Sequence, residues 1–150
     1  MKVHDYHQGN LQLQDQFGTR KLAERLAGRA TETLGEGQRE MIETANMFFL
    51  ATCDERGLPT VSYKGGDPGF VRVVDDRTIA FPNYDGNGKF QSMGNVLQNP
   101  NVGILFIDFE GQLRLRLQGE ASIDDEDPLM TEYHAVSYTH LRAHETEADL

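Results

Sequence analysis

The chain has 150 residues, of which 38% are hydrophobic and 25% charged, and its formal net charge is −10. This length and composition are typical of one soluble globular domain with a sizeable core. A chain this acidic lacks the basic surface that nucleic acids and anionic membranes attract, so we expect neither as a partner. A local cluster of donors could still bind one small anion.

The cysteine content and the N-terminus bear on the compartment. Cys53 is the single cysteine, so no intrachain disulfide and no cysteine-based metal site can form. Residues 1–10 are polar and lack the apolar segment of a signal peptide, and the longest apolar run, 47–51, is too short to span a bilayer. We therefore expect a cytoplasmic protein.

The N-terminal third is expected to be helical after a polar arm. Residues 1–18 are polar and rich in glutamine, which indicates an arm. Thr19 can cap a short helix with one apolar face, and a second helix is predicted over 36–45. We place the folded domain at 19–135.

Hydrophobic runs and turn residues then predict six strands, at 47–52, 59–64, 70–74, 78–81, 102–109 and 113–123. Gly119 indicates a bulge in the last of them. A helix is predicted over 89–97, with Phe90, Met93 and Leu97 facing inward. Short connections without βαβ alternation indicate a mainly β fold, a closed or nearly closed antiparallel barrel with flanking helices.

Residues 136–150 (VSYTHLRAHETEADL) differ in character from the preceding chain. They resemble the translation of a sequencing adapter that ends unrelated metagenomic reading frames. We therefore expect a non-native tail after about Ala135 and a barrel that lacks its C-terminal strand, with an unpaired edge. The alternative is an amphipathic C-terminal helix.

The turn Gly86-Asn87-Gly88-Lys89 is the first candidate anion site. It is not a P-loop, because Asn83 occupies the first glycine position of that motif and Phe90 follows the lysine. The glycines still permit a tight turn, and Lys89 stands where a helix is expected to begin. Free N–H groups and a partial positive charge at that helix start could hold a phosphate. The alternative is a glycine-rich turn with a surface lysine.

The second candidate is Ser62-Tyr63-Lys64, at the end of a predicted strand. Side chains alternate along a strand, so Ser62 and Lys64 share a face and Tyr63 takes the other. If that face meets Lys89, a hydroxyl and two ammonium groups converge on one anion. A solvated strand end is the alternative.

Three further features are weaker indications of a ligand, metal or catalytic site. Arg114 and Arg116 alternate with leucines, which is typical of a solvated or dimer-facing stripe, with ligand contact as the alternative. His140 and His144 stand at i and i+4, a spacing that suits a metal on a helix, but no third ligand accompanies them. Cys53 has no histidine motif beside it, so we interpret it as a residue at the edge of the core. No catalytic acid, base or nucleophile and no metal site is predicted.

Three segments in this order and spacing carry a family resemblance: FFLATCDERGLPTVSYKGG, GFVRVVDDRTIAFPNYDGNGKF and NPNVGILFIDFEGQLRLRLQGEA. Together they resemble the FMN-binding split barrels of the pyridoxamine 5′-phosphate oxidase superfamily, most of all its small bacterial members of loosely assigned function. The resemblance covers about residues 17–135. It implies an antiparallel split β-barrel that binds FMN at the interface of a homodimer.

The resemblance also implies which residues contact FMN. The strand end that holds the phosphate corresponds to Val61, Ser62, Tyr63 and Lys64, and the phosphate turn to Asn87, Gly88 and Lys89. The pair along the flavin corresponds to Phe81 and Pro82, and a further flavin-contacting position falls near Arg114. The chain departs from the oxidase at two of these places. The oxidase has Ser-Arg-Lys at the phosphate turn, and it has a glutamine near the position of Arg114.

The C-terminal Arg and His residues with which the oxidase binds pyridoxamine phosphate have no counterpart in this chain. The resemblance therefore implies FMN rather than that substrate. We expect an FMN-dependent oxidoreductase of an unidentified small molecule or electron donor, in which the flavin supplies the hydride or electron chemistry. The alternatives are a non-catalytic flavin-binding protein, a split barrel that binds deazaflavin or haem, and a structural dimer without a ligand.

Overall fold

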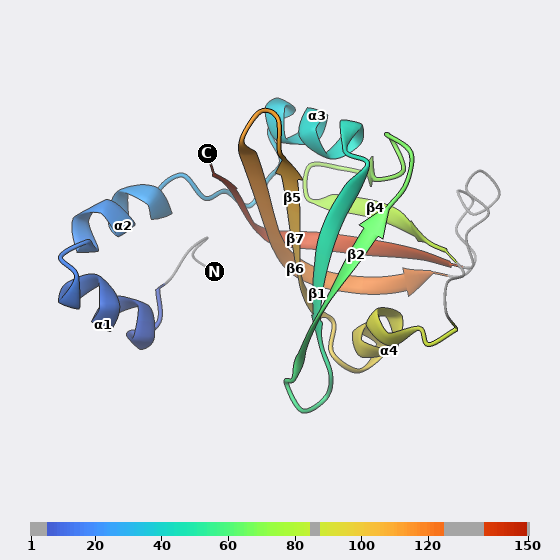
Figure 1. Ribbon diagram of the computed structural model, residues 1–150, viewed down its shortest axis with the longest axis horizontal. Helices are drawn as coiled ribbons and strands as arrows, with labels where there is room; N and C mark the ends of the chain where they lie inside the picture. Colours follow the sequence, from blue (N-terminus) through green and yellow to red (C-terminus); the bar gives the residue numbers. More distant parts are fainter. Residues whose placement is uncertain (1–5, 85–87, 125–136, 150) are drawn as a thin grey trace.

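The structure is a computed structural model, which describes residues 6–84, 88–124 and 137–149 (Figure 1). The helices in these ranges are α1 (Gln8–Gln16), α2 (Arg20–Ala27), α3 (Glu36–Thr44) and α4 (Gln91–Gln98). The strands are β1 (Met47–Cys53), β2 (Pro59–Gly65), β3 (Arg72–Val73), β4 (Thr78–Asn83), β5 (Asn101–Asp108), β6 (Leu113–Asp124) and β7 (Ser137–Asp149). None of the described helices is long and apolar enough to cross a membrane.

The strands form one seven-stranded antiparallel sheet in the order β2-β1-β5-β6-β7-β4-β3. The sheet is curled but not closed, because no ladder among the described residues joins β2 to β3. Figure 1 shows α3 at one end of the strands and α4 at the other. The expected mainly β, antiparallel architecture with flanking helices is confirmed.

A cluster of phenylalanines forms the centre of the core. Phe48 on β1 lies 4.9 Å from Phe81, 5.4 Å from Phe106 and 5.8 Å from Phe70, measured between ring centroids. All four side chains are fully buried. They tie β1, β4, β5 and the loop before β3 into one packed interior, because aromatic pairs at these separations add to the gain from apolar burial.

Strand β7 differs from the expectation for the C-terminal tail. The tail was predicted to leave the barrel without its last strand, or to form a helix. Residues Ser137–Asp149 instead form a strand that pairs with β6 on one side and β4 on the other. The physical reason is a period of two over residues 139–143, where Thr139, Leu141 and Ala143 are buried, His140 is partly buried and Arg142 is exposed. The sheet therefore has a strand between β6 and β4.

The same ladder contains the predicted bulge. The register between β6 and β7 shifts between Gln118 and Gly119. A Cβ atom built on Gly119 would lie against the carbonyl oxygen of Arg142, so only glycine fits there. The bulge predicted at Gly119 is confirmed.

The N-terminal helices stand apart from the barrel (Figure 1). The predicted arm contains a helix, α1, which the polar sequence did not indicate. His7 begins it: its Nδ1 atom accepts hydrogen bonds from the N–H groups of Gly9 and Asn10, in a capping role for which histidine is an uncommon residue. Helix α2 begins directly after Thr19, as predicted, but the Thr19 side chain makes no capping hydrogen bond.

Helix α4 begins two residues later than predicted and turns a different face to the core. Ser92 and Val96 are its buried residues, whereas Phe90 is 45% and Leu97 73% exposed. The prediction that Phe90 and Leu97 face inward is therefore wrong. A helix of eight residues can present either of two neighbouring apolar stripes, and packing against the barrel selects between them.

Candidate functional site

A cavity of about 400 Å³ lies between strand β2, the end of β4 and the beginning of α4. These elements come from opposite sides of the split in the sheet, since β2 is one edge strand and β4 is next to the other. The cavity is within the size range of small-molecule sites. Its lining is Thr60, Val61, Ser62, Tyr63, Lys64, Gly65, Phe70, Pro82, Asn83, Tyr84, Gly88, Lys89, Phe90, Gln91, Ser92 and Met93.

Strand β2 supplies a hydroxyl and an ammonium group from one face. Thr60, Ser62 and Lys64 are partly buried, whereas Val61 and Tyr63 between them are 69% and 64% exposed. The prediction that Ser62 and Lys64 share a face is confirmed. The Oγ atom of Ser62 is buried and has no hydrogen-bond partner among the described residues. Such an orphaned hydroxyl is uncommon, because burying a polar group without a partner costs about 1–3 kcal/mol.

Lys64 reaches across the cavity to α4. Its Nζ atom donates a hydrogen bond to Ser92 Oγ at 2.9 Å. Burial lowers the pKa of Lys64 from its ordinary value, because desolvation penalises the charged ammonium group. No carboxylate stands in a salt bridge with Lys64 among the described residues. A partly buried lysine of this kind is suited to a ligand that brings its own negative charge.

The first turn of α4 adds backbone donors. The first hydrogen bond within the helix runs from the N–H of Gly94 to the carbonyl of Phe90 at 2.7 Å. The N–H groups of Gln91, Ser92 and Met93 therefore have no partner inside the helix, and all three residues line the cavity. A helix N-terminus also carries a partial positive charge, so an anion is stabilised there.

The backbone enters α4 through two left-handed residues. Gly88 has φ of 75° and Phe90, the N-cap residue, has φ of 49°. Glycine adopts this conformation freely, whereas a bulky residue such as phenylalanine adopts it at a cost. Lys89 lies between them at the rim of the cavity. This sharp entry brings Lys89 and the helix amides to the same wall.

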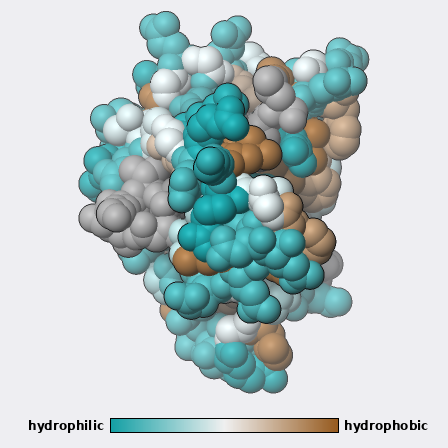
Figure 2. All heavy atoms as spheres, turned by 90° about the vertical axis from the view of Figure 1, so that its left-hand side faces the viewer, coloured by the Kyte–Doolittle hydropathy of each residue, from teal (hydrophilic) through white to brown (hydrophobic). Residues whose placement is uncertain are grey.

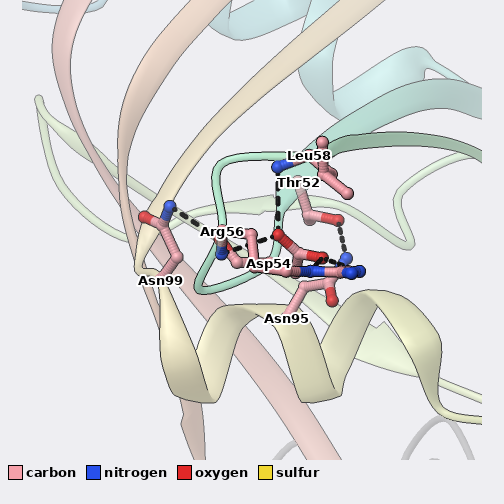
Figure 3. A network of polar contacts seen from close by, with 6 residues as sticks. All are labelled: Thr52, Asp54, Arg56, Leu58, Asn95 and Asn99. Carbon is pink, nitrogen blue, oxygen red and sulfur yellow. Dashed lines mark hydrogen bonds and ion pairs between the residues drawn. The ribbon is translucent and has the colours of Figure 1, made fainter.

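The end of β1 and the turn after it hold the middle and the C-terminal end of α4 (Figure 3). Asn95 donates from Nδ2 to Thr52 Oγ1 at 3.0 Å, and Asn99 donates from Nδ2 to the carbonyl of Asp54 at 3.4 Å. Since β1 pairs with β2, these bonds set α4 at a fixed distance from the strand that carries Lys64. The position of Lys64 on β2 relative to the start of α4 therefore depends on these contacts.

Asp54 holds that turn together. Its carboxylate accepts hydrogen bonds from the N–H groups of Arg56 at 2.8 Å and Leu58 at 3.0 Å, and from the Arg56 guanidinium at 2.7 and 3.0 Å. The Leu58 N–H and then the Arg56 side chain lower the pKa of Asp54, because each favours the charged form. The sequence indicated a turn here but not its link to α4.

Asn83 forms the wall opposite β2. Its Nδ2 atom donates to Ser137 Oγ at 2.9 Å and to Thr139 Oγ1 at 2.8 Å, and Thr139 Oγ1 donates to Asn83 Oδ1 at 3.1 Å. These bonds tie the end of β4 to β7. Asn83 and Ser92 are lining residues that the site predictions missed. Ser92 had one available signal, a small hydroxyl residue in the first turn of a predicted helix.

The structure brings most of the predicted cofactor residues to this cavity. Its lining includes Val61, Ser62, Tyr63, Lys64, Pro82, Gly88 and Lys89. Asn87 lies outside the described residues.

Phe81 and Arg114 lie elsewhere. The Phe81 ring is buried in the core against Phe48, so its side chain does not face the cavity. Phe81 is held there by its packing in the core, whereas Pro82, the next residue of β4, lines the cavity. Arg114 is exposed on β6, opposite Ile107, and does not line the cavity.

The histidine pair of the tail does not form a helical metal site. His140 and His144 lie on strand β7, where four residues span about 13 Å, rather than one turn apart on a helix. Among the described residues there is no group of three or more metal-ligating side chains.

Taken together, the cavity presents two lysines, an orphaned hydroxyl and three helix amides to one space. These are hydrogen-bond donors, and nothing in the described lining carries a carboxylate. Such a donor set fits a phosphate group, whose oxygens accept hydrogen bonds and whose charge offsets that of the lysines. Apolar walls from Phe70, Pro82 and Met93 could accompany a phosphate-bearing molecule with a flat or hydrophobic part.

Comparison with known proteins identifies one family. The family model for pyridoxamine 5′-phosphate oxidase matches residues 34–148, which is most of the chain. No curated protein matches the sequence significantly.

Solved structures show the same fold at low sequence identity. A point variant of HupZ from Group A Streptococcus has a TM-score of 0.63 and 19% identity, over 77% of this chain and 98% of the other. A pyridoxamine 5′-phosphate oxidase candidate from Lactobacillus delbrueckii has a TM-score of 0.62 and 20% identity, over 77% and 94%. An F420 reductase has a TM-score of 0.52 and 19% identity, over 77% and 98%. The expected split-barrel fold is thereby confirmed.

Proposed function

Because the chain belongs to the pyridoxamine 5′-phosphate oxidase family, we propose that it is an FMN-dependent oxidoreductase that holds the FMN phosphate in the cavity between β2 and α4. The observation that carries the proposal is the buried, unpartnered Oγ atom of Ser62 beside the partly buried Lys64. Both features cost stability in the free protein, and a bound phosphate would satisfy both.

The residues of the cavity divide the binding between charge and hydrogen bonding. Lys64 and Lys89 would neutralise the phosphate. Ser62, Ser92 and the first-turn amides of α4 would donate hydrogen bonds to its oxygens. Pro82 would line the path of the ribityl chain or ring.

When bound, FMN supplies hydride or electron transfer, which is chemistry that protein side chains lack. The task of the chain is then to bind, orient and shield. Lys64 would keep a positive charge at the phosphate end, while the apolar side chains of Phe70 and Met93, which also line the cavity, would limit the access of water. No side chain of the cavity is assigned as acid, base or nucleophile.

A deazaflavin is the second candidate. One structural neighbour is an F420 reductase, and a deazaflavin that carries a phosphate would present the same anion to Lys64 and α4. The donors of the cavity do not distinguish the two ring systems, because they lie at the phosphate end. Direct titration with each cofactor decides between them.

We also propose a homodimer with the cofactor at its interface, as the family resemblance implies. The outward side of β2 supports this, since Val61 and Tyr63 are exposed hydrophobic side chains on the edge strand beside the cavity. A second chain covering them would close that side of the cavity. Sedimentation of the FMN-loaded protein as a dimer is the expected result.

The test of function uses absorbance and anaerobic reduction. Purified protein supplied with FMN is expected to become yellow and to retain the flavin through gel filtration. Bleaching of the bound flavin by NADH or NADPH without oxygen then identifies an enzyme, and its absence identifies a flavin-binding protein. Retention of F420 instead of FMN would identify a deazaflavin protein, and a Soret band would identify a haem protein. Protein that retains none of these contradicts the proposal.

A further inference from the structure

The N-terminal helices α1 and α2 form an arm that leaves apolar side chains uncovered. Leu13 on α1 and Phe17 directly after it are 53% and 69% exposed, and Leu22 and Leu26 on α2 are 48% and 39% exposed. Each pair stands at i and i+4, so each makes a stripe on its helix. Figure 2 views the molecule from the side of the arm and shows hydrophobic side chains among a mainly hydrophilic surface.

The arm is ordered by contacts within itself. Tyr6 donates from its hydroxyl to the carbonyl of Ala23 at 2.8 Å, and Arg20 bonds both the carbonyl of Leu11 at 3.3 Å and the Asp15 carboxylate at 2.7 Å. The two helices are therefore joined to each other, and their apolar stripes are left for another surface. The arm also precedes the part of the chain that the family model matches.

The base of the arm is attached to the barrel close to where α2 ends. Thr31 exchanges two backbone hydrogen bonds with Thr146 on β7, at 2.9 and 2.7 Å. Arg77 and Glu32 form an ion pair at 3.1 Å next to this bridge. Only residues 28–30 lie between α2 and the fixed Thr31, so the arm projects away from its own barrel (Figure 1).

The charge of α2 and its flanking residues is opposite to that of the molecule. Residues 19–30 contain four basic side chains and one acidic one, a formal charge of +3, whereas the whole chain carries −10. Lys21, Arg25 and Arg29 are exposed. Helix α2 is thus a basic amphipathic helix on an acidic protein.

A groove beside α3 has an apolar lining and acidic charged residues, which complement the apolar stripe and the basic residues of α2. It lies between α3, the start of β1 and the β5–β6 turn, and it encloses about 730 Å³. Its apolar lining includes Met41, Met47 and Leu113, and Phe109 beside them is 72% exposed. Its charged lining residues are acidic, with no lysine or arginine in the described part of the groove: Glu40, Asp108 and Glu110.

We propose that the arm of one chain docks in this groove on a second copy of the chain, with Leu22 and Leu26 on the apolar floor and the basic residues of α2 against the acidic rim. The complementarity of both charge and hydrophobic pattern selects this occupant. Two chains that exchange arms in this way form a closed, two-fold symmetric pair. The contact uses surfaces separate from the FMN cavity, so its test does not depend on the proposed function.

Disulfide trapping between different chains tests the docking. In a Cys53→Ser background, one full-length chain carries Leu26→Cys and a second carries Leu113→Cys. The matched control replaces Leu113→Cys with Leu97→Cys, a more exposed leucine on α4 outside the groove. Mixing and mild oxidation should give about tenfold more cross-linked L26C–L113C pair than control pair, because a docked arm raises the local thiol concentration well above that in solution. Equal yields would overturn the proposal.

Further measurements distinguish a second copy of the chain from the other possible partners of the arm and the groove. A single chain carrying both L26C and L113C should form its disulfide between chains; a disulfide within the monomer shows that the arm folds onto its own groove and overturns the proposal. Lys21→Glu with Arg25→Glu should reduce the cross-linked yield to the control level. Sedimentation with anionic phospholipid vesicles should leave the protein in the supernatant, and co-sedimentation together with control-level cross-linking identifies a membrane as the occupant instead.

Discussion

Lys64 Nζ donates a hydrogen bond to Ser92 Oγ at 2.9 Å, and this bond joins strand β2 to the first turn of α4 across 28 positions of the sequence. Both residues line the cavity, and the bond places the ammonium group at the first turn of the helix, whose amides have no partner within the helix. Two weak signals in the sequence, a strand-end lysine and a glycine-lysine turn, thereby become walls of one site. Substitutions in each wall should therefore affect the same ligand.

Ser62→Ala should weaken FMN binding by about tenfold or more, because the hydroxyl would donate to a charged phosphate, a bond worth about 1.5–3 kcal/mol. The same change should leave the unfolding temperature of the cofactor-free protein unchanged or higher, since it removes a buried group without a partner. Fluorescence titration of FMN and thermal unfolding measure the two effects. Thr60→Ser, one step along the same face, is the matched control, and an equal loss of affinity there would argue against a specific role for Ser62.

Lys64→Met should separate stability from function. The folded-state pKa of Lys64 is below its ordinary value, so the charged lysine opposes folding of the cofactor-free protein at neutral pH. The variant should therefore unfold at a higher temperature than the wild type when free and bind FMN more weakly by at least about tenfold. Differential scanning calorimetry with and without FMN gives both quantities. A variant that is less stable and binds FMN normally would contradict this account of Lys64.

The affinity for FMN should fall at alkaline pH. Lys64 attracts the phosphate only when protonated, and its lowered pKa in the free protein brings the loss of charge below 10.5, the ordinary value for lysine. Binding should then be constant at neutral pH and decline as the pH rises through the pKa of Lys64. Lys64→Arg keeps its charge throughout this range, so its affinity should decline less. Parallel pH profiles for the two proteins would show that another group is responsible.

Asp54→Asn should lower stability in a pH-dependent way. The pKa of Asp54 is lower in the folded protein than its ordinary 3.8, so its charge stabilises the fold above pH 3.8. That contribution is lost as the pH falls through the folded-state pKa. The difference in unfolding temperature between wild type and variant should be full at pH 7 and shrink below about pH 4. A difference that does not change with pH would mean that the charge of Asp54 does not matter to the turn.

The sequence predicted the elements of the barrel well because their patterns are local. The alternation along Pro59–Gly65 placed Ser62 and Lys64 on one face, and Gly119 marked the bulge. Strand β7 was not predicted, although the spacing of Thr139, Leu141 and Ala143 is typical of a strand.

The composition of the site was less predictable, because it depends on contacts between distant segments. Phe81 and Pro82 were predicted to lie along the flavin together, but the Phe81 ring packs against Phe48 in the core and only Pro82 lines the cavity. Ser92 reaches the cavity because α4 packs against the barrel, and Asn83 is held there by its hydrogen bonds to β7. Local sequence patterns specify neither contact. The hydrogen bonds from Asn95 to the end of β1 and from Asn99 to the turn after it likewise depend on packing alone.

The central claim is that one phosphate-binding site joins Lys64, Lys89 and the start of α4. Calorimetric titration with FMN tests it most directly, on the wild type, Lys64→Ala, Lys89→Ala and the arm variant Lys21→Ala as the charge-matched control. We predict saturable binding of one FMN per chain, unchanged by Lys21→Ala and weakened by each of the other two substitutions. No FMN binding by the wild type, or the same affinity in both cavity variants as in the wild type, would contradict the account.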